Sequence, residues 1–280
     1  MDAAGHLALK PAGLTAGFPT SLAISTDGMN EKGLTVSTQV FTQSVLYMQP
    51  SAPEASGTNV CFVAFADWIL DNFDSVKSLR DRITSDSLPN LNIVSALPAV
   101  LEALRKKSPS LAGLAGLHWS IDDASEHIVL EVLDGVIKMH NNTVGVVTNQ
   151  PDFTWHLRNL NNFVNLRSDW PRNPDIQVQT DSEGSEFQPE VGLVPNVSKA
   201  GHGFNLLGIP GDYSPPSRFV RLFYLREYAM LRFKPKKRNK DSIALVTGLL
   251  NNVFINKGTA PDPTPGEGEY TQYTVLKIPG

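Results

Sequence analysis

Four consecutive runs of strand-like composition lie between residues 114 and 148, with only tight turns between them. Apolar and β-branched side chains dominate these runs, which cover residues 114–121, 126–133, 135–140 and 144–148. Pairs such as Asp134-Gly135 supply the chemistry of a two-residue turn. Strands joined by such short connections pair antiparallel, so this block predicts an antiparallel sheet and not an alternating βαβ fold.

The rest of the chain adds helices before and after this block. Helices are predicted over residues 58–73, 76–83, 97–106, 216–232 and 241–254, and further strands over residues 21–25, 34–41 and 272–277. A hairpin turn with Gly28 and Gly33 at positive φ is expected to join the first two of those strands. The order strands, helices, strands, helices, strand predicts an α+β fold in which helices stack on antiparallel sheets. We expect one domain over residues 20–280, preceded by a poorly defined segment, residues 1–19.

The composition excludes several classes of protein. The 280 residues carry a formal net charge of −4. The only basic run, residues 234–238, is interpreted as a solvated loop, so no nucleic-acid partner is expected. No window approaches the roughly twenty apolar residues that a membrane-spanning helix needs, and the N-terminus lacks the basic and apolar parts of a secretory signal. We therefore expect a soluble chain without membrane contact, and the single cysteine leaves its compartment undetermined.

The segment Pro210–Arg221 (PGDYSPPSRFVR) is the strongest candidate for a functional site. Its Pro-Gly-Asp turn leads into residues 214–217, which have the composition of a helix cap and first turn. Arg218 is then expected near the start of a helix, at the mouth of the cleft that the preceding loop forms. Because glycine permits the tight turn and proline restricts the backbone around it, the guanidinium is expected to have a defined direction.

Asn149 is the second candidate, because it lies where the chain leaves a predicted strand, directly before Gln150-Pro151. A carboxamide at a strand end can direct its NH₂ group at a developing oxyanion. An Asx-turn that ends the strand explains the same residue equally well, and the local sequence does not separate the two interpretations. The region 149–213 is poor in regular signals, and loops of that length in a compact domain are usually functional.

Other candidate sites are weaker. The run Gly201–Gly208 lacks the flanking strand and helix of a phosphate-binding loop and is interpreted as part of a cleft lining. His118 and His127 lie in adjacent predicted strands and are interpreted as structural residues, not metal ligands. Asp122 and Asp123 are typical of a turn and not of an acid/base pair. We therefore expect neither a metal site nor a cofactor.

Three segments carry a combined signal: Asp27–Leu34 (DGMNEKGL), Thr148–Asn162 (TNQP followed by NLNN) and Gly208–Phe219 (GIPGD followed by SRF). Taken together, they resemble the choloylglycine hydrolase family, which includes bile salt hydrolases and penicillin V acylases among the N-terminal nucleophile hydrolases. Residues 271–274 (TQYT) also match a strand of the family. The resemblance therefore runs from about residue 20 to the end of the sequence.

The resemblance implies a four-layer αββα fold and hydrolysis of a non-peptide amide C–N bond in a small acylated substrate. In the family a cysteine thiol attacks the amide carbonyl, its own α-amino group handles the proton, and water releases the thioester. On that pattern Asn149 donates a hydrogen bond to the oxyanion, and Arg218 lies beside the nucleophile, where a cation raises the thiolate fraction. The second oxyanion donor is expected from the backbone N–H of Gln39 or Val40.

The sequence departs from the family pattern at the nucleophile. In the family a cysteine opens the mature chain, whereas this sequence begins Met1-Asp2. Its only cysteine, Cys61, falls inside a predicted amphipathic helix, where the expected role is that of a small buried residue. The resemblance therefore implies a chain without the nucleophile strand and, because it stops at Gly280, without further C-terminal strands.

Two functions of different classes follow from this departure. The first is an amide hydrolase that is active when a longer product includes the nucleophile strand. The second is a non-catalytic remnant or binding protein that keeps the pocket without the thiol. In either case residues 43–57 and 165–209 are expected to determine which amide is bound. Missing strands would expose a sheet edge and apolar surface, so we expect a homo-oligomer or poor solubility.

Overall fold

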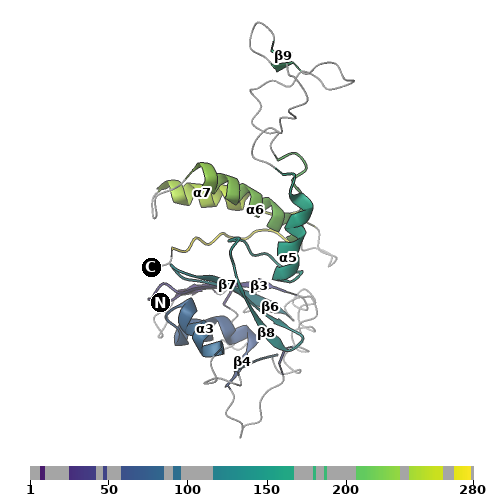
Figure 1. The fold of residues 1–280 in the computed structure, drawn as a ribbon. Helices are drawn as coiled ribbons and strands as arrows, with labels where there is room; N and C mark the ends of the chain where they lie inside the picture. Colours follow the sequence, from purple (N-terminus) through teal and green to yellow (C-terminus); the bar gives the residue numbers. More distant parts are fainter. Residues whose placement is uncertain are drawn as a thin grey trace.

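A six-stranded sheet is the main element of the computed structural model (Figure 1). The structure describes residues 7–9, 25–41, 47–48, 58–84, 91–95, 116–166, 179–180, 186–187, 206–233, 240–260 and 268–278. The strand order is β1-β2-β3-β6-β7-β8, and every neighbouring pair is antiparallel. These strands are β1 (Leu7–Leu9), β2 (Asp27–Met29), β3 (Thr35–Val40), β6 (Leu117–Asp122), β7 (His127–Leu133) and β8 (Val136–Asn141).

Helices cover both faces of this sheet, which confirms the predicted α+β class (Figure 1). One face carries the 3-10 helix η2 (Phe62–Ala64) and the helices α2 (Phe65–Asn72) and α3 (Val76–Thr84). The other face carries α5 (Phe153–Asn159), the 3-10 helix η4 (Leu160–Phe163), α6 (Pro215–Arg232) and α7 (Lys240–Asn251). Two small sheets pair β4 (Thr58–Cys61) with β5 (Leu91–Val94) and β9 (Gln179–Thr180) with β10 (Glu186–Phe187). None of the helices in the described part of the chain is long and apolar enough to cross a bilayer.

The two faces of the sheet differ sharply in polarity. Successive side chains of β6 point to opposite faces, so Trp119 and Ile121 enter the core beside α2 while His118 and Ser120 face α5 and α6. The apolar face carries the larger cluster, whose fully buried members include Leu34, Val36, Phe65, Ile69, Val76, Leu79, Ile93, Trp119, Ile128 and Leu130. The opposite face holds a small cluster made of Val129, Val146, Phe153 and Phe219. Polar side chains therefore lie between the sheet and the second helical layer.

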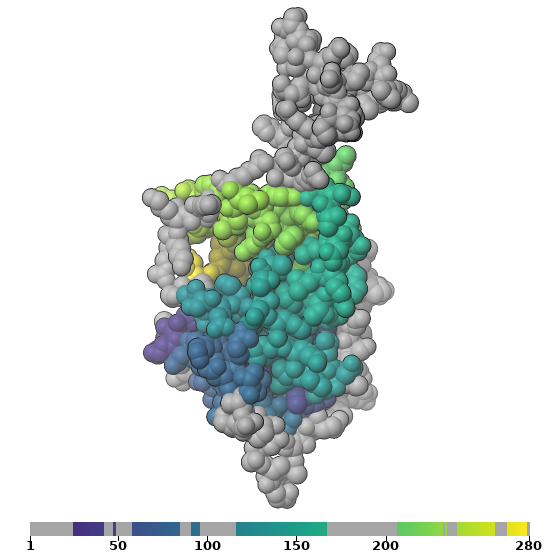
Figure 2. Space-filling view, in the orientation of Figure 1, coloured from purple at the N-terminus to yellow at the C-terminus, as the bar shows by residue number. Residues whose placement is uncertain are grey.

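An extended C-terminal segment, residues 268–278, lies between the sheet and the layer of α6 and α7 (Figure 1). Figure 2 shows it in yellow beside a hollow between these two layers. Lys277 fixes the segment to the polar face, because its Nζ donates to Asp27 Oδ1 at 2.9 Å, Val36 O at 2.9 Å and Ser37 Oγ at 2.5 Å. The predicted strand 272–277 is wrong, since these residues pair with no strand among the described residues. From one side to the other, the described residues thus form a layer of helices, the six-stranded sheet, this extended segment and a second layer of helices (Figure 1).

Several predicted helices and strands are confirmed, with shifts at their ends. The confirmed helices are α3, α6 and α7, and the confirmed strands are β3, β6, β7 and β8. Asp134 and Gly135 both have positive φ, as a tight two-residue turn requires. The predictions for residues 21–24, 97–106, 114–115, 201–205 and 234–238 fall outside the described residues.

Three local predictions are wrong. Residues 58–61 form β4, parallel to β5, and not the start of a helix, because apolar residues at 60, 62, 63 and 65 fit a buried strand as well as a helical face. Residues 144–148 form no strand, since Gly145 adopts a φ of 65° and its N–H donates to the Asn142 side chain. Residues 27–29 form β2, so the hairpin turn is shorter than predicted, and only Gly33 has positive φ.

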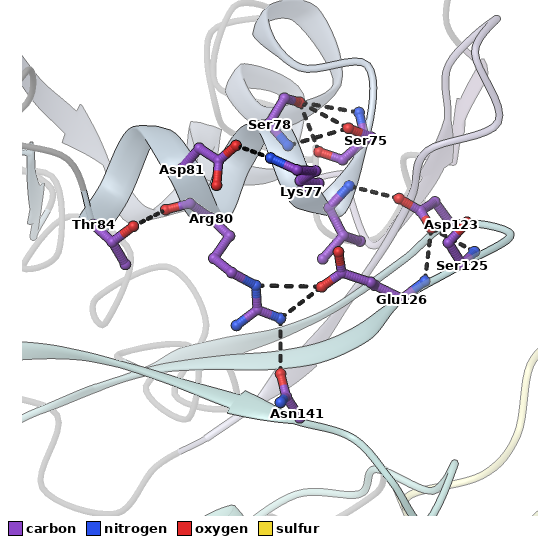
Figure 3. Close-up of polar contacts among 11 residues, drawn as sticks. Ser75, Lys77, Ser78, Arg80, Asp81, Thr84, Asp123, Ser125, Glu126 and Asn141 are labelled. Atoms are coloured by element: carbon purple, nitrogen blue, oxygen red, sulfur yellow. Dashed lines mark hydrogen bonds and ion pairs between the residues drawn. The ribbon is translucent and has the colours of Figure 1, made fainter.

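Polar contacts fix α3 against the turn between β6 and β7 (Figure 3). Asp123 Oδ2 accepts a hydrogen bond from Val76 N at 2.7 Å, while its Oδ1 accepts from Ser125 N and Glu126 N at 2.7 and 2.8 Å. Arg80 adds an ion pair with Glu126, at 2.9 Å from Nη2 to Oε2. Asp123 is therefore a turn residue, as predicted, and also caps the neighbouring helix.

Replacing Asp123 by alanine is expected to lower the free energy of unfolding by about 1–2 kcal/mol, because three backbone N–H groups lose their acceptor. Burial raises the pKa of Asp123, but the three hydrogen bonds outweigh it and lower the pKa overall. This stabilisation is therefore present above the ordinary carboxyl pKa and is lost as pH falls through the lowered value. Urea titration at neutral pH measures the change. The control is Asp81→Ala, which breaks only an exposed ion pair with Lys77 and should leave the midpoint unchanged.

Candidate active site

Asn149 and Arg218 lie in direct contact, although 69 positions separate them in the sequence. Arg218 Nη2 donates to Asn149 Oδ1 at 2.6 Å, and Asn149 Nδ2 donates to the carbonyl of Val40 at 2.8 Å. The two bonds fix the orientation of the carboxamide, because its oxygen faces the cation and its NH₂ group faces the end of β3. The second hydrogen of that NH₂ group has no acceptor among the described residues. The structure thus brings together three of the four predicted site residues.

The first turn of α6 sets the position of Arg218. Asp212 tightens this turn, since Oδ1 accepts from Ser214 N at 2.8 Å and Oδ2 accepts from Ser217 Oγ at 2.5 Å. These serine contacts lower the pKa of Asp212 to about 2, so it is ionised at neutral pH. Arg218 Nε donates to Tyr213 O at 2.9 Å, which leaves Nη1 without an acceptor among the described residues. Burial lowers the pKa of Arg218, yet the guanidinium stays charged because its ordinary pKa is so high.

Gln39 and Val40 direct their backbone N–H groups in opposite directions. Phe41 N donates to Gly116 O on the β6 side, whereas Thr38 N donates to Thr26 O on the β2 side. Because alternate residues of an antiparallel strand point to opposite neighbours, the N–H of Gln39 points toward β6 and that of Val40 points away from it. Asn149 reaches Val40 from this second side. Of the two predicted oxyanion donors, the ladder geometry therefore favours Val40.

A cleft of about 700 Å³ lies on the polar face of the sheet and reaches the site at Gln39. The side-chain Oε1 of Gln39 is buried without a hydrogen-bond partner among the described residues. The cleft extends along β3 and β6 to α6. Its lining includes Ser37 of β3, Ser120 and Asp122 of β6, Asn142 after β8, and Arg226 of α6. Of the predicted site residues, only Gln39 borders it.

Three buried residues behind Asn149 were not predicted as part of the site. His118 lies 2.7 Å from Thr148 O through its Nε2, and His156 lies 2.9 Å from Asn149 O through its Nε2. Glu131 is fully buried and contacts His118 Nδ1 at 3.1 Å. His118 is structural, as predicted, but its partner is the loop that carries Asn149. The signal in the sequence is Glu131, a carboxylate inside an apolar strand (HIVLEVL), which must find hydrogen-bond donors when buried.

Cys61 does not have the properties of a nucleophile. It ends β4 and packs against the larger hydrophobic cluster, on the apolar side of the sheet. Burial raises the pKa of its thiol, which is the opposite of the change that a reactive cysteine needs. It lies in a strand and not in the predicted helix, but its role as a small packed residue agrees with the sequence. Among the described residues, no group of three His, Cys, Asp or Glu residues is placed to hold a metal ion.

Comparison with known proteins supports the resemblance seen in the sequence. Residues 12–277 match the model of the linear amide C–N hydrolases of the choloylglycine hydrolase family. A bile salt hydrolase/transferase of Clostridium perfringens is 31% identical over 252 residues, which cover 89% of this chain and 64% of that protein. A conjugated bile acid hydrolase of Lactobacillus acidophilus is 32% identical over 214 residues, covering 76% of this chain and 56% of the relative.

Solved structures agree with this relationship. A mutant of the conjugated bile acid hydrolase from Clostridium perfringens superposes with a TM-score of 0.65 at 27% identity, covering 91% of this chain and 66% of the other. A penicillin V acylase from Agrobacterium tumefaciens has a similar fold, with a TM-score of 0.52 at 20% identity. That match covers 88% of this chain and 57% of the acylase chain. The chain therefore spans between 56% and 66% of the length of these relatives. On the match to the family model, and on these relatives, the chain belongs to the choloylglycine hydrolase family.

Proposed function

We propose that this protein hydrolyses the amide C–N bond of a small acylated substrate, with Asn149 and Arg218 in its active site. The observation that carries the proposal is the carboxamide of Asn149, held between the Val40 carbonyl and the Arg218 guanidinium. This arrangement leaves one carboxamide N–H hydrogen to stabilise an oxyanion. Such preorganised donors are usually the largest single contribution to acyl-transfer catalysis.

The proposed reaction proceeds through a thioester. A thiolate attacks the carbonyl carbon, and the negative charge moves to the carbonyl oxygen, where Asn149 Nδ2 and the N–H of Val40 donate to it. The tetrahedral intermediate collapses, the C–N bond breaks, and the amine leaves with the proton that the thiol gave up. Water then attacks the thioester carbonyl, which releases the carboxylic acid and restores the thiol.

Arg218 is proposed to stabilise the thiolate. Its Nη2 and Nε are engaged by Asn149 and Tyr213, so the guanidinium is fixed while Nη1 remains available to an anion. A fixed cation beside a thiol lowers the thiol's pKa and raises the thiolate fraction at neutral pH. The half-buried Cys61 packs on the opposite, apolar side of the sheet and cannot be this thiol. The family pattern assigns the role to an N-terminal cysteine whose α-amino group is the base.

The names of the relatives suggest the substrates to test. Relatives of this chain are named bile salt hydrolase, conjugated bile acid hydrolase and penicillin V acylase. We propose the corresponding substrate class, a bulky acyl group joined through an amide to a small polar amine. Release of glycine from a glycine-conjugated bile acid, and of 6-aminopenicillanic acid from penicillin V, should be measured for the natural protein isolated from its own cells. Absence of hydrolysis of every such amide would contradict the proposal.

The alternative function is binding without catalysis, and the inert environment of Cys61 favours it for the 280-residue chain. Calorimetric titration of this chain with a conjugated bile acid distinguishes the two functions when it is combined with the assay. Binding by the chain with no hydrolysis by the natural protein supports a binding protein. Hydrolysis by the natural protein supports the enzyme.

Replacing Arg218 by lysine is expected to lower kcat/KM for amide hydrolysis about 10–100-fold. A lysine cannot keep the hydrogen bonds to both Tyr213 O and Asn149 Oδ1, and losing one charge-assisted hydrogen bond costs about 1.5–3 kcal/mol. The pH–rate profile of the variant should also shift to higher pH, because a less stabilised thiolate forms only at higher pH. The control is Arg158→Lys on the exposed face of α5. A kcat/KM unchanged in the Arg218 variant would show that Arg218 acts neither on the thiol nor on Asn149.

A further inference from the structure

Two buried histidines hold the two peptide groups on either side of the Asn149 α-carbon. His118 Nε2 lies 2.7 Å from the carbonyl oxygen of Thr148, and His156 Nε2 lies 2.9 Å from that of Asn149 itself. A carbonyl oxygen only accepts hydrogen bonds, so both Nε2 atoms carry a proton and donate it. The rings come from different elements, β6 and α5, and both are almost fully buried.

Holding these two peptide groups fixes the direction of the Asn149 side chain. The peptide plane before the α-carbon and the plane after it together define φ and ψ, which are the only soft backbone dihedrals of a residue. With φ and ψ set, the Cα–Cβ bond of Asn149 has one direction. The carboxamide can therefore meet Val40 O and Arg218 at the same time.

Stacking holds each imidazole in its orientation. The ring of His118 stacks on Phe41, with centroids 4.8 Å apart and planes 16° apart. The ring of His156 stacks on Phe219, with centroids 4.6 Å apart and planes 13° apart. Burial lowers the pKa of His156, so this ring is neutral with its proton on Nε2, and no described residue bonds to its Nδ1. A neutral ring in this tautomer is the form that can donate to Asn149 O.

Glu131 links the two histidines. Its Oε1 lies 3.1 Å from His118 Nδ1 and accepts from Phe153 N at 3.0 Å, at the start of the helix that carries His156. The proton on His118 Nε2 is already donated to Thr148 O. A hydrogen bond between His118 Nδ1 and Glu131 Oε1 therefore needs a second proton, which lies between these two atoms. Glu131 Oε2 is 3.7 Å from His140 Nε2, and neither atom has a hydrogen-bond partner among the described residues. The carboxylate is thus oriented toward His118 and α5.

We propose that His118, Glu131 and His156 form a positioning network that holds the Asn149 carboxamide in the geometry required for oxyanion stabilisation. The expected effect of the network on the reaction rate rests on the proposed function. Its expected effect on the position of the Asn149 side chain does not. A misplacement of about 1 Å at a reacting group can cost about 100-fold in rate, which makes such a network effective without any contact to substrate.

The test compares two replacements of His118 that differ in one hydrogen-bond donor. His118→Gln places an NH₂ group near the position of Nε2 and can still donate to Thr148 O, whereas His118→Phe keeps the stacking on Phe41 but donates nothing. We expect His118→Phe to lower kcat about 100-fold with KM changed less than twofold. His118→Gln should restore kcat to within about tenfold of the wild type. Arg158→Gln, at an exposed position of α5, is the control and should change neither constant.

A second readout does not require activity. Resonances of the Asn149 side-chain NH₂ group, followed by ¹H–¹⁵N NMR in the 280-residue chain, should shift and exchange faster with solvent in His118→Phe than in His118→Gln. Glu131→Gln should leave the His118 ring proton on Nε2, because the new carboxamide NH₂ group can donate to Nδ1. The imidazole ¹⁵N shift of Nδ1 should then report the loss of the shared proton.

The two readouts separate failure of the network from failure of the proposed function. If the wild-type protein hydrolyses no amide, the proposed function fails, and the NMR comparison still decides whether the network positions Asn149. Unchanged Asn149 resonances in His118→Phe would overturn the inference whatever the kinetics. Equal losses of kcat and of thermal stability in the Phe and Gln variants would also overturn it, because they would indicate a packing role alone.

Discussion

Replacing Asn149 by alanine is expected to lower kcat for amide hydrolysis by about 10²–10³-fold, with a much smaller change in KM. The variant removes a carboxamide whose oxygen is held by Arg218 at 2.6 Å and whose NH₂ group is held at Val40 O at 2.8 Å. A donor fixed in this way stabilises charge that exists only in the transition state, so its loss affects the chemical step more than substrate binding. Steady-state release of glycine from a glycine-conjugated bile acid measures both constants.

A matched control comes from the same segment of the chain. Asn162 is an exposed residue of the 3-10 helix η4, and among the described residues its side chain bonds to Asn159 alone. Asn162→Ala should therefore keep the wild-type kcat and KM. An Asn149 variant with normal kcat and a raised KM would place Asn149 in substrate binding, which contradicts the oxyanion role. Asn149→Asp should be as inactive as Asn149→Ala, because a carboxylate oxygen facing Val40 O cannot donate a hydrogen bond.

The meeting of Asn149 and Arg218 could be predicted because both residues lie in segments with strong local signals. A Pro-Gly-Asp turn followed by a capped helix defines where Arg218 must lie, and a strand end before a proline defines where the chain turns at Asn149. That the two side chains lie in one site, however, is implied by the family resemblance and not by these local signals. Composition and periodicity alone place no residue of β3 beside a residue 109 positions later, as the bond between Asn149 and Val40 requires.

Other features could not be predicted because the deciding contacts are tertiary. Val60 and its apolar neighbours fit a helix and a buried strand equally well, and pairing with β5 selects the strand. Residues 144–148 have strand composition, but the Thr148 carbonyl bonds to His118 and not to a neighbouring strand. The role of His118 itself depends on Glu131 and on a loop carbonyl, which no spacing in the sequence reveals.

The small cluster on the polar face links the stability of the fold to the geometry of the site. Phe219 follows Arg218 directly in α6, is fully buried, and packs on His156 and Phe153. The same side chain therefore holds the first turn of α6 against α5 and supports the ring that bonds to Asn149 O. Loss of this packing should reduce stability and activity together, unlike loss of an oxyanion donor.

Replacing Phe219 by alanine is expected to lower the free energy of unfolding by about 3–5 kcal/mol, the range for deleting a fully buried phenylalanine. Guanidinium titration monitored by circular dichroism measures the loss, and Phe219→Leu should recover more than half of it, because leucine refills most of the cavity. The control is Phe233→Ala at the end of the same helix, where the side chain is 43% exposed and the change should stay below about 1 kcal/mol. Equal effects at positions 219 and 233 would mean that α6 does not pack on α5 through Phe219, and the position of Arg218 would then need another explanation.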